Sequence, residues 1–170
     1  MLSPAWSLDE RAVRRFLEEA RRIATFDHDN IARVFASGAD RGSYFFAMEL
    51  VDGQDIHDEL DGVRKEVGTM RLFLPPRDAD DYFKSVARIV ADIARALACA
   101  HRIGIVHRDV QPRNIMLGRD GRPRLVDFGI ARDLSFGAVV ATTMTYGTPH
   151  YMSPEQVDRA TGAVDERTDI

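Results

Sequence analysis

The stretch HRDVQPRN, residues 107–114, holds the side chains that decide how this chain is interpreted. It places Asp109 and Asn114 five positions apart, a spacing that could put a carboxylate and a metal-binding amide on one loop. A second motif, VDFGIAR at 126–132, adds Asp127. Because Mg²⁺ takes hard oxygen ligands and keeps some of its water, one carboxylate and one amide oxygen are enough to hold it. The three side chains are therefore a candidate set for phosphoryl transfer.

The composition is that of a globular protein. The chain has 170 residues, of which 45% are hydrophobic and 29% charged, enough for one domain with a core. Its net charge of −4 argues against a nucleic-acid-binding protein, which needs a basic surface. The single cysteine, Cys99, fits a reducing, cytoplasmic setting. No apolar run approaches the roughly 18 residues that a membrane-spanning helix needs.

Hydrophobic periodicity predicts two long helices and an antiparallel strand pair. Residues 7–26 and 80–102 carry apolar side chains at helical spacing, and Gly104 follows the second helix as a stop signal. The β-rich runs at 31–38 and 43–51 flank a turn and are expected to pair.

The remaining segments predict shorter elements. DGQDIHDEL favours the start of a short helix, and residues 61–78 are expected to form a loop. IVHRDVQPRNIML and RPRLVDFGIA are expected to form short strands around loops. SPEQV is expected to begin a helix, with Ser153 as its cap and Pro154 at the first helical position.

HRDVQPRN, VDFGIAR and GTPHYMSPEQ at 147–156 resemble, in this order, the motifs of protein kinases, most closely bacterial serine/threonine kinases of the eukaryotic-like type. HDNIARV resembles the segment after the family's αC helix, and YFFAMELVDGQDI the last small-lobe strand and the hinge. The resemblance implies a truncated α+β protein-kinase-like fold. Residues 1–51 would supply a partial small lobe and the hinge, and residues 52–170 part of a mainly helical large lobe.

The resemblance also implies catalytic roles. Asp109 is similar to the catalytic Asp that accepts or orients the substrate hydroxyl proton, and Asn114 and Asp127 to the Mg²⁺ ligands. Gln111 stands where serine/threonine kinases place a lysine that contacts the γ-phosphate, so the donor is kept and the charge is lost. Arg113 matches an arginine position of many tyrosine kinases and could restore that charge. The implied reaction transfers the ATP γ-phosphate to Ser or Thr of a protein substrate.

Nucleotide-binding positions are implied in the same way. Met48 resembles the gatekeeper, Glu49 and Val51 would offer hinge backbone groups to adenine, and Met116 would touch adenine from below. Both methionines are also compatible with plain core positions.

Regulatory positions follow from the resemblance as well. Glu19 matches the αC glutamate, and Arg108 would pair with a phosphorylated threonine, with Thr142, Thr143 and Thr145 as candidate acceptors. Thr148 matches a position that helps to fix a Ser/Thr substrate. The threonine cluster is also compatible with a flexible polar loop.

A further group of residues is expected to support the site. Ile23, Val34, His107 and Phe128 match the stacked regulatory spine, and Asp169 matches the residue that anchors its His107 end. For His107, core packing is the favoured interpretation over a role as a base.

The sequence departs from the family pattern before its first helix. No glycine and no lysine precede that helix, and the lysines are Lys65 and Lys84, so neither the Gly-rich loop nor the paired lysine is present. We therefore expect an incomplete kinase fragment with little activity of its own, cytoplasmic or the cytoplasmic part of a longer, membrane-anchored protein. The alternative is a catalytically dead, kinase-like binding module.

Overall fold

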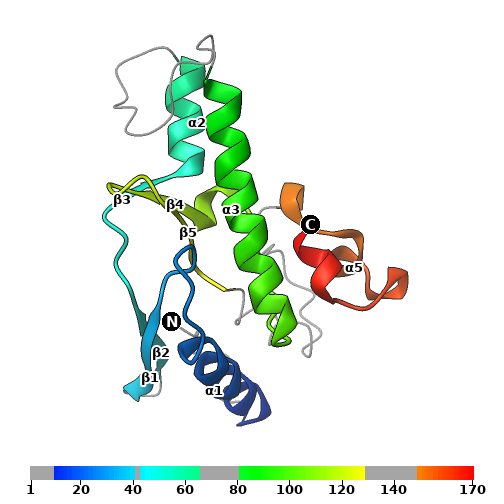
Figure 1. The fold of residues 1–170 in the computed structure, drawn as a ribbon. Helices are drawn as coiled ribbons and strands as arrows, with labels where there is room; N and C mark the ends of the chain where they lie inside the picture. The colour runs from blue at the N-terminus through cyan, green and yellow to red at the C-terminus, as the bar shows by residue number, and fades with distance from the viewer. Residues whose placement is uncertain (1–9, 41–42, 66–80, 129–148) are drawn as a thin grey trace.

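The computed structural model describes residues 10–40, 43–65, 81–128 and 149–170. Helices α1 (Glu10–Ala24), α2 (Ile56–Lys65) and α3 (Tyr82–Arg102) accompany two small antiparallel sheets (Figure 1). Separate helices with small antiparallel sheets confirm the α+β class.

The first sheet pairs β1 (Val34–Asp40) with β2 (Ser43–Met48) and confirms the predicted antiparallel pair. The second sheet has the order β3 (Gly53–Asp55), β4 (Ile115–Gly118), β5 (Pro123–Leu125). The three-residue β3 was not predicted, because a strand this short has no periodicity to recognise.

Main-chain hydrogen bonds tie the segment before β1 to β5. The Ala32 N–H donates to the Leu125 carbonyl at 2.9 Å, and the Leu125 N–H donates to the Asn30 carbonyl at 2.8 Å. A segment that leads from α1 into β1 is thereby fixed against the strand that leads to Asp127.

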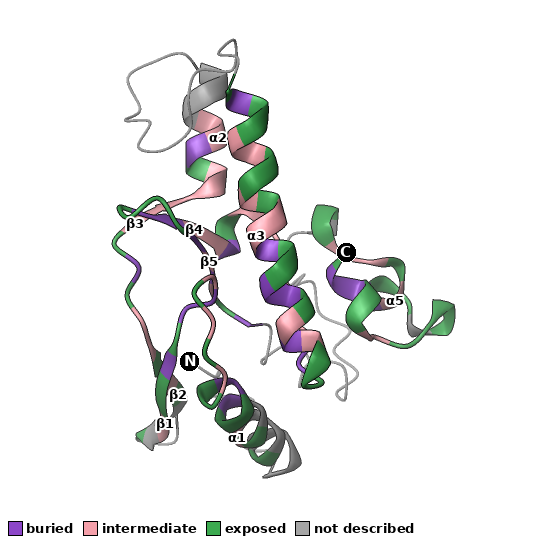
Figure 2. Cartoon of the chain, in the orientation of Figure 1, coloured by how far each residue is buried: buried purple, intermediate pink, exposed green. Residues whose placement is uncertain are grey.

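The core lies where α1, α3 and β5 meet, as the buried residues in Figure 2 show. Its buried members come from these three elements, from the first residue of β1 and from adjoining loops: Ile23, Ile31, Val34, Ile93, Ala96, Leu97, Ala100, Ile105, Leu125 and Phe128. Val90 of α3, at 61% exposure, and Ala24 of α1 are apolar residues of the two predicted helices that lie in solvent.

Helix α3 ends in a Schellman motif that directs the chain toward residues 107–114, called the HRD loop below. Gly104 adopts φ +73°, its N–H donates to the His101 carbonyl at 2.9 Å, and the Ile105 N–H donates to the Ala100 carbonyl at 3.0 Å. Gly104 therefore stops the helix as predicted.

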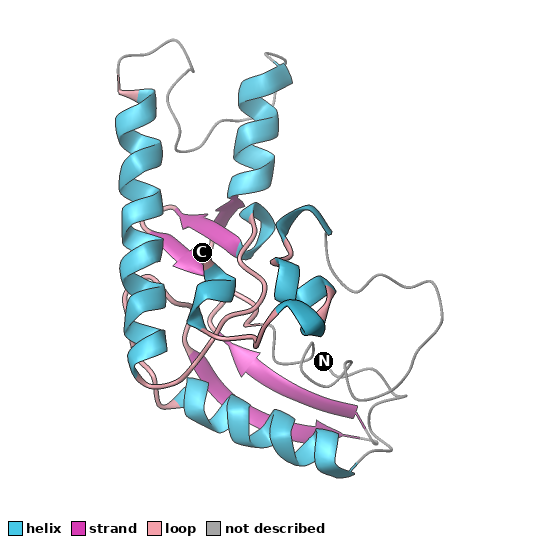
Figure 3. Cartoon of the chain, turned by 90° about the vertical axis from the view of Figure 1, so that its right-hand side faces the viewer, coloured by secondary structure: helices cyan, strands magenta, loops and turns pink. Residues whose placement is uncertain are grey.

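The shorter elements required some correction, and Figure 3 shows them from a second side. Helix α2 continues to Lys65, inside the stretch predicted as a loop, and residues 66–80 lie outside the described part. Helix α5 (Pro154–Val157) begins after Ser153 as predicted. The chain ends in the 3₁₀ turn η5 (Glu166–Asp169), not in an α-helical turn. Among the described residues, no helix has the length and apolarity to cross a membrane.

Candidate active site

Asp109 is oriented by contacts on its side chain and on both of its backbone groups. Its N–H donates to Nδ1 of His107 at 3.2 Å, and its carbonyl accepts Nδ2 of Asn114 at 2.8 Å. Its Oδ1 accepts Nε2 of Gln111 at 2.9 Å. The residue that replaces the family's lysine thus contacts the expected carboxylate, but as a neutral amide.

Asn114 ends the 3₁₀ turn η2 (Pro112–Asn114) and is buried. Its N–H donates to the Gln111 carbonyl, and its own carbonyl accepts the Val126 N–H, both at 2.9 Å. The second bond holds Val126, the residue before Asp127, against Asn114. Because Nδ2 of Asn114 donates to the Asp109 carbonyl, the amide oxygen of Asn114 is directed away from that carbonyl.

Asp127 is solvent-exposed and adopts φ +54°, in the left-handed region. Aspartate tolerates this conformation better than most residues. The donor chemistry of Asn114 and Asp127, one amide oxygen and one exposed carboxylate, fits a magnesium ion. Within the described ranges, no group of three or more His, Cys, Asp or Glu side chains is placed to hold a metal.

His107 is fully buried and supports the loop from below. Its Nε2 lies 3.0 Å from the Val126 carbonyl, and its Nδ1 accepts the Asp109 N–H, so the ring carries its proton on Nε2. Its ring centroid lies 4.6 Å from that of Phe128. Burial lowers the pKa of His107 from its usual 6.5, against the opposing charge of Asp169, so the ring is neutral. These contacts agree with core packing.

Asp169 of η5 holds the start of the loop, as the resemblance implied. Its buried carboxylate accepts the N–H of His107 at 2.8 Å and the N–H of Arg108 at 2.7 Å. Nε2 of His101, on α3, lies 2.7 Å from the same carboxylate. A residue near the end of the sequence thus fixes both the loop and the helix that precedes it.

The segment expected to form the hinge, residues 48–51, begins at the last residue of β2 and leads toward β3; it is called the hinge segment below. Met48 is half-buried against the core, Val51 is buried, and Met116 is half-buried in β4. The Glu49 N–H donates to the Arg33 carbonyl at 2.7 Å, and its carboxylate accepts the Arg33 N–H at 3.2 Å.

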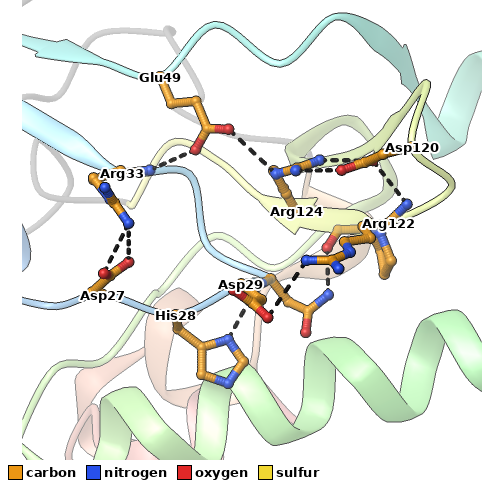
Figure 4. A network of polar contacts seen from close by, with 10 residues as sticks. Asp27, His28, Asp29, Arg33, Glu49, Asp120, Arg122 and Arg124 are labelled. Atoms are coloured by element: carbon orange, nitrogen blue, oxygen red, sulfur yellow. Dashed lines mark hydrogen bonds and ion pairs between the residues drawn. The ribbon is translucent and has the colours of Figure 1, made fainter.

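A network of charged side chains surrounds Glu49 (Figure 4). Arg124 Nε lies 3.3 Å from the Glu49 carboxylate, and Arg124 NH2 lies 2.6 Å from Asp120. Hydrogen bonds from Arg124 lower the pKa of Asp120 to about 2. Arg122 pairs with Asp29 at 3.5 Å. Glu49 of the hinge segment is therefore tied to the β4–β5 hairpin through Arg124, a contact that was not predicted from the sequence.

The structure brings Asp109, Gln111 and Asn114 together and joins them through Val126 to Asp127. Arg113 lies in η2 with an exposed side chain. Glu19 lies in α1, but its side chain is outside the described part, as are the four candidate threonines, Thr142, Thr143, Thr145 and Thr148. Gln156 and His101 were not predicted from the sequence to belong to the site. The only signal for Gln156 was its capping-box spacing from Ser153.

Comparison with known proteins agrees with this geometry. The model of the protein kinase domain matches residues 6–170. Serine/threonine-protein kinase PknL of Mycobacterium tuberculosis is 35% identical over 162 residues, which cover 95% of this chain and 36% of that kinase. PrkC of Bacillus subtilis, also a serine/threonine-protein kinase, is 35% identical over 148 residues, 87% of this chain and 20% of PrkC.

A crystal structure of the Mycobacterium tuberculosis PknI kinase domain superimposes with a TM-score of 0.69 at 33% identity. The match covers 99% of this chain and 56% of that domain. The chain thus spans about half of a solved kinase domain and a smaller share of the full-length relatives. With three motifs, fold and family model in agreement, the chain belongs to the protein kinase domain family.

Proposed function

We propose that this chain is part of a serine/threonine protein kinase that transfers the γ-phosphate of ATP to Ser or Thr of a protein substrate. Residues 1–51 would contribute to the small lobe and hinge, and residues 52–170 to the large lobe. The observation that carries the proposal is the hydrogen-bonded unit of Asp109, Gln111 and Asn114, joined through Val126 to Asp127. A cytoplasmic location would supply the ATP.

In the proposed reaction, the Asp109 carboxylate accepts the proton of the substrate hydroxyl as the hydroxyl oxygen attacks the γ-phosphorus. The bond between the γ-phosphorus and the bridging oxygen of the β-phosphate breaks, and ADP leaves. Gln111 orients that carboxylate through its Oδ1 contact. Asn114 and Asp127 would hold Mg²⁺, which neutralises charge on the phosphates when it is bound. Glu49 and Val51 would face adenine through their backbone groups, with Met48 and Met116 beside the ring. Glu19, Arg108, Arg113 and the threonines remain proposed regulatory or charge-supplying positions.

Magnesium-dependent nucleotide binding tests the site. We expect ATP to bind the chain more tightly with Mg²⁺ than without it, and Asp127→Asn and Asn114→Ala each to weaken Mg²⁺-dependent binding by at least about tenfold. Asp52→Asn, which removes an exposed carboxylate outside the site, is the matched control. ATP binding with the same affinity with and without Mg²⁺, and in Asp127→Asn, would overturn the proposal.

A catalytically dead binding module is the second candidate, favoured by the neutral Gln111 at the carboxylate of Asp109. It predicts nucleotide or partner binding without transfer, even in a longer protein that contains this chain. For residues 1–170 alone we expect little phosphotransfer, because no glycine or lysine precedes α1. Turnover by these residues that Asp127→Ala abolishes would contradict this expectation.

A further inference from the structure

Gln156 connects α5 to the HRD loop through the two ends of its side-chain amide. It is 8% exposed, and its Nε2 donates to the Arg108 carbonyl at 2.6 Å. Its Oε1 accepts the Ser153 N–H at 3.1 Å. The first contact joins residues 48 positions apart. Nothing in the catalytic unit described above involves this side chain.

The residue that Gln156 contacts has a backbone conformation that needs support. Arg108 adopts φ +65°, a left-handed conformation that is unfavourable for a residue with a Cβ. The Arg108 N–H is held by Asp169 at 2.7 Å, and its carbonyl by Gln156. Both backbone polar groups of Arg108 are thus fixed by side chains from the C-terminal part of the chain, and the next residue is Asp109.

We propose that Gln156 is a positioning residue for Asp109. By holding the Arg108 carbonyl, it fixes the peptide that joins Arg108 to Asp109, and so the direction in which the Asp109 carboxylate leaves the loop. This proposal rests on the proposed function for its catalytic meaning. Gln156 itself touches no reacting atom.

The chemistry of the side chain separates this role from simple helix capping. A capping box at this position needs only an acceptor for the Ser153 N–H, and Glu serves there as well as Gln. Donation to a carbonyl needs the amide NH₂, which Glu lacks at neutral pH. Gln156→Glu therefore keeps the cap, removes the donor and places a carboxylate against the Arg108 carbonyl.

The test compares Gln156→Glu, Gln156→Met and Ser153→Ala with the unmodified chain, all without nucleotide. Residue-resolved amide hydrogen exchange of Arg108 and Asp109 reports the opening of the loop, with the α3 amides of Ile93 and Leu97 as an internal reference. The ¹³C chemical shift of the Asp109 carboxyl carbon reports the surroundings of that side chain.

We expect Gln156→Glu and Gln156→Met each to accelerate exchange at Arg108 and Asp109 at least about tenfold relative to α3, and to shift the Asp109 carboxyl resonance. Ser153→Ala removes the contact of the Ser153 hydroxyl with Oε1 of Gln156 at 3.4 Å. It should leave both signals unchanged, because the backbone N–H of residue 153 still donates to Oε1 and Nε2 still donates to the Arg108 carbonyl. If Gln156→Glu changes neither the exchange rates nor the Asp109 carboxyl shift, Gln156 serves only as a cap and the proposal is overturned. If exchange accelerates equally throughout α3, Gln156 acts on global stability and the proposal is likewise overturned. Since no nucleotide is present, failure here is distinguishable from failure of the proposed ATP site.

Discussion

At the scale of single residues, the site depends on side chains that hold backbone groups as much as on those that would meet substrate. His107 and Asp169 make no direct contribution to the proposed chemistry, yet they accept the hydrogen bonds that fix the N–H groups of His107, Arg108 and Asp109. Hydrogen bonds to a charged acceptor are stronger than those to a neutral one. The buried carboxylate of Asp169 is therefore well suited to stabilise an unfavourable loop conformation.

The buried neutral His107 makes stability depend on pH. Because its pKa is below 6.5 in the folded chain, the unfolded chain binds this proton more readily once the pH falls below 6.5. Its contribution is therefore constant above that pH and becomes destabilising below it, by up to about 1.4 kcal/mol per pH unit. We expect His107→Phe to lower stability but to reduce the loss between about pH 7.5 and about pH 5.5. Urea unfolding at both pH values measures this, and parallel losses in the two proteins would contradict it.

Substitution of Arg113 tests whether its positive charge compensates for the neutral Gln111. If its guanidinium supplies the positive charge that the family's lysine provides, Arg113→Ala should weaken Mg²⁺·ATP binding about fivefold to tenfold, and Gln111→Lys should restore it. Arg119→Ala, which removes an arginine paired with Asp52, is the matched control. Equal binding by Arg113→Ala and Arg119→Ala would show that the charge is not replaced.

At the scale of elements, the Schellman motif at the end of α3 sets the direction in which the chain enters the HRD loop. A Cβ added at Gly104 would meet nothing within 4 Å, so the cost of substitution is conformational only. We expect Gly104→Ala to destabilise the chain by about 1 kcal/mol and Gly104→Asn by less, since Asn tolerates left-handed φ. Chemical denaturation measures both, and equal stability of all three proteins would show that the motif adjusts without cost.

The charged network around Glu49 holds the hinge segment in place more than it stabilises the folded chain. Arg33 and Arg122 are more than half exposed, and exposed pairs contribute only about 0.2–1 kcal/mol each. Arg124 is 17% exposed and contacts both Glu49 and Asp120, so it carries most of the connection between hinge and hairpin.

The sequence predicted elements well where periodicity or a stop signal was present, and contacts poorly where they join distant segments. Helix α3 and its end at Gly104 follow from apolar spacing and one glycine. In contrast, the contacts His101–Asp169 and Gln156–Arg108 join residues 68 and 48 positions apart and leave no local pattern. The roles of Asp109, Asn114 and Asp127 came from the family resemblance, because isolated Asp and Asn residues are common in turns.

At the scale of the whole molecule, the described part leaves several large apolar side chains in solvent. Phe35 is 63%, Leu50 92%, Phe83 69% and Val157 70% exposed. These exposed side chains contrast with residues 107–114, whose backbone is held by the buried groups of His107, Gln156 and Asp169.

The central claim is that Asn114 and Asp127 form the metal-binding part of a nucleotide site beside Asp109. The most direct measurement is paramagnetic broadening of amide resonances by Mn²⁺ with a non-hydrolysable ATP analogue, recorded on the unmodified chain and on Asp127→Asn. We predict that broadening centres on residues 109–116 and 125–128 and is lost in the variant. Broadening centred instead on the carboxylates of Asp27, Asp29 and Asp120, and unchanged by Asp127→Asn, would contradict the account.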